Sequence, residues 1–315
     1  MNIYLDTNLW NALCDQRVDP STLLASLNAK NAHLVLGTHN FYELAKTFEG
    51  SREGASERGR ELFACLVKFF DANVLCAKDN MEILAAEMYA VKQSIPVDAF
   101  LGRQDRVSFS QKVKAFADGM FGEIDTHYIG ELISFASNTR QNQILHLEEH
   151  ADIKTRLKGV SSANLAQWMR QQVFSAAGLE QLARHVQGRF PEIPANKATE
   201  DASGLLSLPA RRIARGLILA DLYYNWRCAC RESNPKDLVD DMQHILNAVY
   251  CDTYATGDTR QAEYAELLLT SNTRVNIYRA EIPVDEWLHG LATAGGLDTH
   301  VKMVSVNSPP RSSVR

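Results

Sequence analysis

Residues 3–8 read IYLDTN, and this short stretch decides the fold class that the sequence predicts. Ile3, Tyr4 and Leu5 are β-branched, aromatic and aliphatic, a composition typical of a strand in the middle of a parallel sheet. Asp6 stands directly after this strand, although a carboxylate is rarely placed there for packing alone. Ligands of open parallel sheets bind outside the carboxyl ends of strands. The stretch therefore predicts a parallel sheet with a functional acid at its edge.

The first 78 residues alternate between strand and helix. Apolar runs predict further strands at 33–37 (HLVLG) and 72–77 (ANVLCA), and the segments between them have helical spacing. The helical stretch 38–50 ends at Gly50, a residue type that commonly ends helices. This alternation predicts an α/β fold with three layers, α/β/α, in which helices cover both faces of a parallel sheet.

The pattern changes between residues 79 and 232, where β-branched runs almost vanish. Apolar residues of the stretch 163–186 keep helical spacing throughout. The Pro- and Gly-containing pieces 95–105 and 190–204 are typical of loops between helices. We therefore expect residues 79–232 to form a large all-helical insertion.

Alternation of helices and strands returns after residue 233. A helix over 234–250, with Asn234 as its N-cap and Pro235 in its first turn, precedes a strand at 252–258 that ends in an acid. A helix, a strand and a last helix are then expected at 261–269, 274–280 and 284–291.

The two α/β parts, residues 1–78 and 233–300, are expected to form one discontinuous domain. Residues 301–315 have little to bury, so we expect a disordered tail. The chain has 315 residues, of which 45% are hydrophobic and 23% charged, values that allow a sizeable core.

Some classes of protein are excluded by the net charge, the cysteines and the hydropathy of the chain. The formal net charge of -5 excludes binding of nucleic acid through bulk positive charge. The six cysteines are scattered, which predicts free thiols in a reducing compartment. No basic leader precedes an apolar stretch, and no apolar run reaches the roughly 18 residues of a membrane span. We expect a cytoplasmic protein without membrane contact.

Four carboxylates can reach one edge of the expected sheet. Asp6 and Asp258 each follow a strand, Glu43 lies one turn into the helix after the second strand, and Asp241 lies on the helix before the strand at 252–258. Like charges this close raise each other's pKa unless a positive charge is present. A divalent metal supplies that charge, and oxygen ligands favour Mg²⁺ or Mn²⁺.

Each of these acids also has a purely structural interpretation. Glu43 is three residues after Asn40 and could be the glutamate of a capping box. Asp241 and His244, three apart, could form a surface pair on a helix. Asp258 could occupy a turn before the following helix.

Three motifs, IYLDTN, HNFYELAK (39–46) and DDMQHILNAVYCDTYATGD (240–258), occur in this order. Together they resemble the PIN-domain nucleases over roughly residues 1–78 and 233–290. The resemblance implies that one or two Mg²⁺ or Mn²⁺ ions are held by four acids: Asp6, Glu43, Asp241 and Asp258. It implies supporting positions at Asn8, Thr256 and His244. The third acid stays open among Asp237, Asp240 and Asp241, of which Asp241 fits the pattern best.

The same resemblance implies a function. A PIN-like enzyme would hydrolyse RNA with a metal-activated water and leave a 5'-phosphate and a 3'-hydroxyl. The cellular role implied by the resemblance is that of a toxin or a defence nuclease. The partners of such a protein would include an inhibitory protein and a second copy of the chain. A non-catalytic PIN-like module that binds RNA or protein is the alternative, and a missing acid would be its sign.

An acidic cleft repels phosphate, so substrate must be held elsewhere. Arg211, Arg212 and Arg215 lie within about one helical turn and could contact RNA. Nearby aromatic side chains could stack on bases: Tyr223, Tyr224 and Trp226. The alternative is a solvated basic face whose aromatic residues lie in the core.

Two other enzyme classes have weaker support. HLEEH at 146–150 matches the H-x-x-E-H pattern of one group of zinc metallopeptidases, with Glu149 as base. A haloacid-dehalogenase phosphatase would also place a nucleophilic acid after the first strand. It would need a second aspartate two residues later, where this chain has Asn8.

Overall fold

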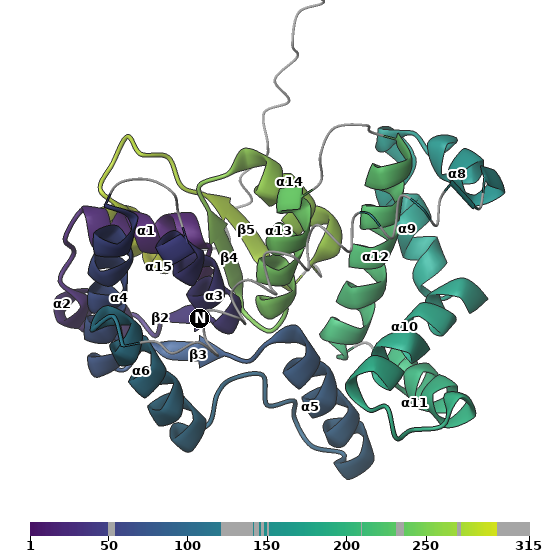
Figure 1. Ribbon diagram of the computed structural model, residues 1–315, viewed down its shortest axis with the longest axis horizontal. Helices are drawn as coiled ribbons and strands as arrows, with labels where there is room; N and C mark the ends of the chain where they lie inside the picture. Colours follow the sequence, from purple (N-terminus) through teal and green to yellow (C-terminus); the bar gives the residue numbers. More distant parts are fainter. Residues whose placement is uncertain are drawn as a thin grey trace, which may run out of the picture.

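Five parallel strands form the central sheet of the computed structural model, in the order β3-β2-β1-β4-β5 (Figure 1). The strands are β1 (Asn2–Leu5), β2 (His33–Gly37), β3 (Leu75–Ala77), β4 (Thr253–Thr256) and β5 (Arg274–Ile277). The structure describes residues 1–49, 54–120, 151–208, 210–230, 236–269 and 272–294, with 141, 145, 148 and 149 singly. The predicted α/β class with a parallel sheet is confirmed.

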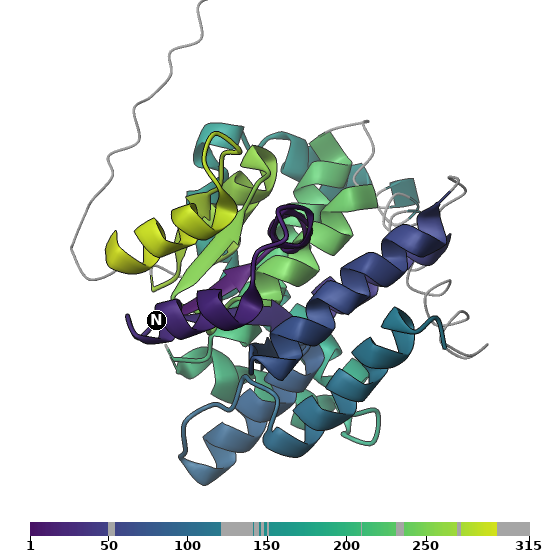
Figure 2. The same cartoon turned by 90° about the vertical axis from the view of Figure 1, so that its left-hand side faces the viewer.

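Alternate residues of the central strand face opposite layers, as the period of two along a strand requires. Ile3 and Leu5 belong to one hydrophobic core and Tyr4 to the other. The first core is built with α1 (Thr7–Asp15), α2 (Pro20–Asn28), α3 (Thr38–Ala45), α4 (Ala55–Asp71), α6 (Arg103–Ala117) and α15 (Val284–Ala294). Figure 2 shows α4 and α6 side by side on this face.

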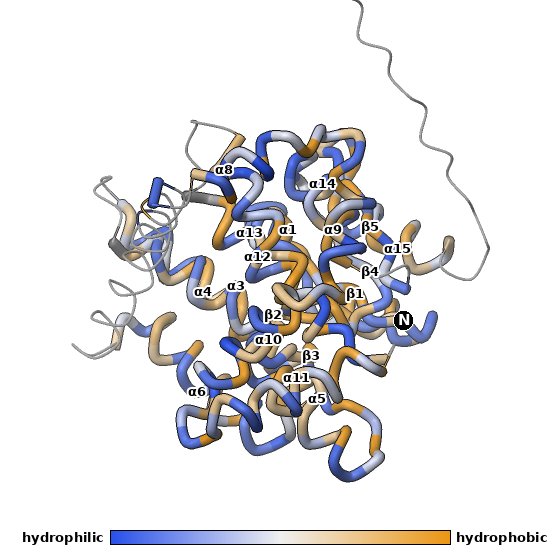
Figure 3. The backbone as a smooth tube through the Cα atoms, turned by 90° about the vertical axis from the view of Figure 1, so that its right-hand side faces the viewer, coloured by the Kyte–Doolittle hydropathy of each residue, from blue (hydrophilic) through white to orange (hydrophobic). Residues whose placement is uncertain are grey.

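The second core extends from Tyr4, Val35 and Tyr254 without a break into a group of helices. These helices are α5 (Asn80–Gln93), α9 (Leu165–Val173), α10 (Ala176–Arg189), α11 (Ala195–Ser207), α12 (Arg212–Cys230), α13 (Lys236–Asn247) and α14 (Thr259–Leu268). A further helix, α8 (Ala151–Lys158), contacts α12. Hydrophobic colour is concentrated in the interior and hydrophilic colour on the outer turns (Figure 3).

The segment predicted as an insertion therefore packs on both faces of the sheet. Helix α6 lies against α4 on one face, whereas α5 and α9 to α12 cover the other. Its described elements are helical apart from an isolated bridge between Ala77 and Phe100. Its boundaries at residues 79 and 232 stay a prediction.

The helical character predicted for 163–186 is confirmed, as two helices: α9 ends at Val173 and α10 begins after Ser175, whose hydroxyl accepts from the Gly178 amide and caps the second helix. One local expectation is wrong. The expected loop 190–204 is helical from Ala195 onward. A proline just before a helix marks its start, and Pro194 has this position directly before α11.

The cysteine expectation is also wrong in part, because Cys14 on α1 and Cys65 on α4 form a disulfide with a Cα–Cα distance of 5.8 Å. The two residues are 51 positions apart, and their spacing in the sequence carries no information about helices that pack side by side. No described helix is long and apolar enough to cross a membrane. The expected tail 301–315 and the cap at Asn234 lie outside the described residues.

A buried carboxylate joins the helices of the second core. Glu87 on α5 is fully buried and accepts from the amides of Ile213 and Ala214 at 2.8 and 3.1 Å, at the start of α12. The Tyr250 hydroxyl donates to the same carboxylate. Burial raises the pKa of Glu87, although these hydrogen bonds act in the opposite direction. The contact fixes α5 against the first turn of α12.

Close packing at the end of β2 requires glycine. A Cβ atom at Gly37 would lie 2.7 Å from Cε2 of Tyr4, a backbone-anchored aromatic ring in the core. We expect Gly37→Ala to lower the free energy of unfolding by about 1–3 kcal/mol, because the ring must move. Gly204→Ala in α11 is the matched control: open space surrounds Gly204, so the same change should stabilise by up to about 1 kcal/mol. Urea unfolding of both variants measures this, and equal effects would contradict it.

Candidate functional site

The strand order reverses at β1 and β4, and the candidate site lies there. From β1 the chain adds β2 and β3 on one side, and it adds β4 and β5 on the other. β1 and β4 are parallel neighbours, with Leu5 opposite Ala255, and the Asp6 amide donates to the Ala255 carbonyl at 2.9 Å. Asp6 and Asp258 therefore follow adjacent strands at the same edge, where α/β sheets bind ligands.

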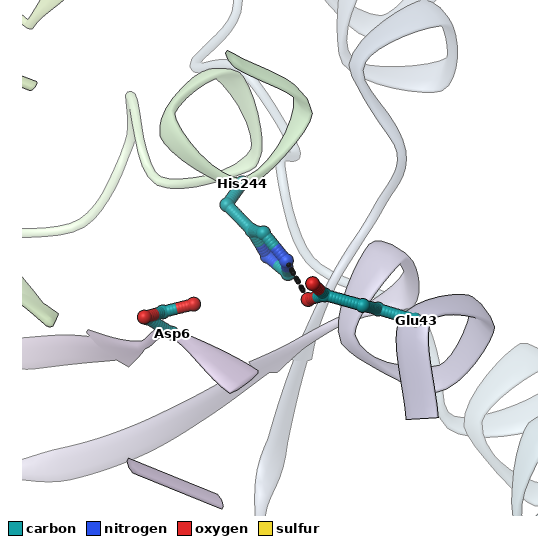
Figure 4. A group of neighbouring side chains, drawn as sticks. All are labelled: Asp6, Glu43 and His244. Atoms are coloured by element: carbon teal, nitrogen blue, oxygen red, sulfur yellow. Dashed lines mark hydrogen bonds and ion pairs between the residues drawn. The ribbon is translucent and has the colours of Figure 1, made fainter. Parts of the chain in front are cut away.

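Three side chains from distant parts of the chain meet at this edge. Asp6 extends from the end of β1, Glu43 from α3 and His244 from α13, as Figure 4 shows. One ligand atom of each lies within 4.8 Å of the other two. Asp6 is 2% exposed and His244 is 1% exposed. This group contains two of the predicted ligands and one residue predicted as support.

Four contacts hold the imidazole of His244. Its Nε2 lies 2.6 Å from Oε2 of Glu43 and 3.2 Å from the Thr7 hydroxyl. Its Nδ1 lies 3.0 Å from the Tyr4 hydroxyl and 3.3 Å from Nδ2 of Asn40. The ring is thus fixed from both sides by β1, α1 and α3.

Asn40 connects α3 to the end of β1. Its Nδ2 lies 3.2 Å from the Leu5 carbonyl, and its Oδ1 accepts from the Gly37 amide at 2.7 Å. Asn40 is therefore itself the third-position residue of the cap on α3. The interpretation of Glu43 as a capping partner of Asn40 is wrong, and the Glu43 carboxylate bonds to His244 instead.

The Asp6 carboxylate is oriented by the two residues predicted to support it. Oδ2 accepts from Nδ2 of Asn8 at 3.1 Å and from the Thr256 hydroxyl at 2.9 Å. The Thr256 hydroxyl also accepts from the Asp258 amide at 3.0 Å. These bonds fix one carboxylate oxygen at the edge of the sheet.

Asp241 and Asp258 lie beside the group of three rather than within it. Oδ1 of Asp241 accepts from Nε2 of Gln261 at 3.0 Å. Oδ1 of Asp258 caps α14 by accepting from the amides of Arg260 and Gln261 at 2.7 and 3.4 Å. The structural interpretation of Asp258 is therefore met, and its other oxygen lies 3.9 Å from the Arg260 guanidinium. Both stay predicted ligands.

Asp240, the neighbouring candidate, faces another direction. Its carboxylate lies 2.7 Å from Nζ of Lys46 and 3.4 Å from Nε2 of His39. These two contacts occupy both of its oxygens, whereas the charges of His244, Asp6 and Glu43 act on Asp241. The side chain of Asp237 lies outside the described residues.

Burial and mutual repulsion shift the protonation of this site. Burial raises the pKa of Asp6, and it raises the pKa of Asp241 to about 7, with the neighbouring carboxylates adding to the second shift. Burial also acts to raise the pKa of Glu43, but the facing His244 outweighs it and lowers this pKa to about 2. Burial acts to lower the pKa of His244, yet Glu43 and the other acids raise it above its usual value. A protonated His244 therefore balances part of the acidic charge.

The aromatic residues proposed to contact RNA are buried, and two of the arginines bond to backbone carbonyls of the protein. Tyr223, Tyr224 and Trp226 are 3, 5 and 6% exposed, so the expectation of an exposed stacking surface beside the arginines is wrong. The guanidinium of Arg212 donates to the Val249 carbonyl at 3.1 Å and that of Arg215 to the Leu206 carbonyl at 3.4 Å. Arg211 is 9% exposed. RNA binding by these arginines stays a prediction, and their described contacts are within the protein.

The competing metal motif HLEEH cannot be placed, because His146 and His150 lie outside the described residues. Within the part of the chain that the structure describes, Asp6, Glu43 and His244 are the group whose geometry suits a metal ion. No model of a protein family, no curated protein and no solved structure matches the chain.

Several residues of the site were not found from the sequence. Gln261, 3% exposed, joins the Thr256 hydroxyl to Asp241. Its position three residues after Asp258 has the spacing of a capping box, a signal that could have identified it. No local signal marks Tyr4 as the partner of His244, since it occupies a regular strand position.

The pair of Glu43 and His244 predicts a window of pH dependence. A lowered pKa of Glu43 contributes stability above about pH 4.5 that is lost as the pH falls toward 2. A raised pKa of His244 contributes stability below about pH 6.5 that is lost as the pH rises through its folded value. Glu43→Gln should therefore destabilise the metal-free protein most between about pH 4.5 and 6.5.

Urea unfolding at about pH 5.5 and about pH 9 measures this window. Glu263→Gln, at an exposed position of α14, is the matched control and should change neither value. A loss of stability for Glu43→Gln that is the same at both pH values would contradict the charge balance described above.

Proposed function

We propose that the protein is a divalent-metal-dependent hydrolase of RNA phosphodiester bonds. The observation that carries this proposal is the convergence of Asp6, Glu43 and His244 within 4.8 Å at the point where strand order reverses. Asp6 is buried and Glu43 is partly exposed, and both act on a third acid, Asp241, whose pKa is raised to about 7. An isolated salt bridge does not require such a group of acids. The excess of acid at one edge favours an added cation.

The donor set fits such an ion. Asp6 and Glu43 offer carboxylate oxygens, which suit Mg²⁺ and Mn²⁺. The imidazole of His244 favours binding of Mn²⁺ over Mg²⁺. Asp241 and Asp258 could add further oxygens at the rim. A bound divalent ion would lower the pKa of water and stabilise charge on phosphate oxygens.

The protein's own groups would orient this chemistry. Asn8 and Thr256 fix Oδ2 of Asp6, and one oxygen of this carboxylate points toward Glu43 and His244 (Figure 4). Asp241, with a pKa of about 7 before an ion binds, could accept the proton of an attacking water. In that role Gln261 would hold the Asp241 carboxylate through its 3.0 Å hydrogen bond.

RNA as the substrate, with 5'-phosphate and 3'-hydroxyl products, is the part of the proposal that rests on the resemblance to PIN-domain nucleases. The same holds for Mg²⁺ as the ion in cells, an inhibitory protein partner, a homodimer and the cellular role of a toxin or defence nuclease. Each follows from the three motifs and from no contact described above.

A non-catalytic RNA- or protein-binding module is the second candidate, and one observation favours it. A protonated His244 at 2.6 Å from Glu43 balances part of the acidic charge without an added ion. If that pair is the resting arrangement, the cluster could serve structure alone. Metal binding separates the two candidates.

Ion binding should release protons and tighten with pH. His244 must be neutral and Asp241 ionised to bind a cation, so Mn²⁺ affinity should rise by about tenfold from about pH 6 to about pH 8. Calorimetric titration in two buffers of different ionisation enthalpy measures the affinity and the protons released. No heat of binding at either pH would support the non-catalytic candidate.

Removal of one ligand tests the catalytic proposal. We expect Asp6→Asn to lower Mn²⁺-dependent cleavage of single-stranded RNA by at least about 100-fold, since a charged ligand becomes neutral without a change of shape. Asp252→Asn is the matched control: Asp252 is exposed and accepts from the Asn2 amide at the opposite end of β1. Undiminished cleavage by Asp6→Asn in purified protein would show that the assignment is wrong.

A further inference from the structure

A pocket of about 570 Å³ lies beside the group formed by Asp6, Glu43 and His244. It is bounded by the starts of α3 and α5 and by facing positions of α10, α12 and α13. His39 lines the pocket, and its ring centroid is 4.6 Å from that of His244. The pocket therefore begins one side chain away from the candidate metal site.

The lining is largely apolar, with a few polar groups. The apolar side chains of the lining include Tyr42, Met81, Leu217, Ala220, Val239 and Met242. Among them stands an amide pair, in which Nδ2 of Asn80 donates to Oε1 of Gln243 at 2.7 Å. His185 and Asp221 form a second pair at 2.8 Å. Small-molecule sites combine apolar walls with few placed polar groups in the same way, at volumes of about 300–1,000 Å³.

Charge decides which part of a nucleotide this pocket suits. Asp79, Asp221 and Asp240 line it, and none of its described lining residues is lysine or arginine. Such a pocket repels phosphate. Its lining suits a flat, uncharged ring with an exocyclic amino group that can donate to carboxylate and amide oxygens.

We propose that this pocket binds the base of the nucleotide next to the scissile phosphate and selects bases with an exocyclic amino group. The proposal rests on the proposed function, because the neighbouring site must hold the phosphate. Acceptor oxygens of Asp221 and Gln243 favour adenine, cytosine and guanine over uracil, which has no amino group. The helices of the second core would thus supply base preference to a site built on the sheet.

Filling the pocket tests this directly. Ala220 lines the pocket from α12, so Ala220→Phe places a ring in its space, and Ala177→Phe at an exposed position of α10 is the matched control. Gln243→Ala is a second variant, which removes a polar wall without adding volume. Thermal unfolding checks that each variant folds, and Mn²⁺ titration checks that the metal site is intact.

Two independent readouts follow. Binding of the four free nucleosides to metal-free protein is measured by saturation-transfer NMR, and base frequencies at cut sites come from sequencing 5' ends of a randomised RNA. We expect uridine to bind at least about tenfold more weakly than the others, and Ala220→Phe to weaken their binding by a similar factor. The cut sites of Ala220→Phe should lose their base preference while Mn²⁺ binding stays unchanged.

Equal binding of all four nucleosides by the wild type, binding unaffected by Ala220→Phe and by Gln243→Ala, or an unchanged cut-site preference would each overturn the base pocket. RNA cleavage without base preference would overturn the pocket and leave the proposed function standing. Selective nucleoside binding that Ala220→Phe abolishes, in a protein that cuts no RNA, would overturn the hydrolase and support the pocket.

Discussion

The contact between Glu43 and His244 is the interaction on which the rest of the site depends. Two carboxylates with limited exposure cannot both ionise at this edge unless a positive charge lies near them. In the metal-free protein the protonated imidazole supplies it, 2.6 Å from Glu43. Tyr4, Thr7 and Asn40 hold the ring in place, so the sheet, α1 and α3 all contribute to the charge balance.

This arrangement links protonation to ion binding. A divalent cation would take over the charge that the proton on His244 now supplies, so the two compete for one position. Burial and the neighbouring carboxylates raise the pKa of Asp241, so a further negative charge at this edge is unfavourable. Gly37 sets the space for the Tyr4 ring, which connects core packing to the orientation of the imidazole.

Strands β1, β2 and β3 were predictable because they are short apolar runs, whereas β4 and β5 are short strand-like segments between helical ones. All five pair in one parallel sheet, as expected. The meeting of Asp6 and Glu43 followed from the rule that carboxyl ends of parallel strands share an edge. Contacts set by tertiary packing were not predictable, such as the partner of Cys14 and the bond from Gln261 to Asp241. Periodicity reports which face of an element is apolar, and it does not report what lies opposite.

The position of β1 has a consequence for synthesis of the chain. This strand is made before the other four described strands of the sheet and lies in its centre, yet its neighbour β4 begins at Thr253. Until then one edge of β1 has no strand beside it, and an unpaired edge invites pairing with other chains. His244 is synthesised only shortly before β4, so a growing chain on the ribosome holds Asp6 and Glu43 but no complete site. The candidate site is therefore complete only when most of the chain has been made.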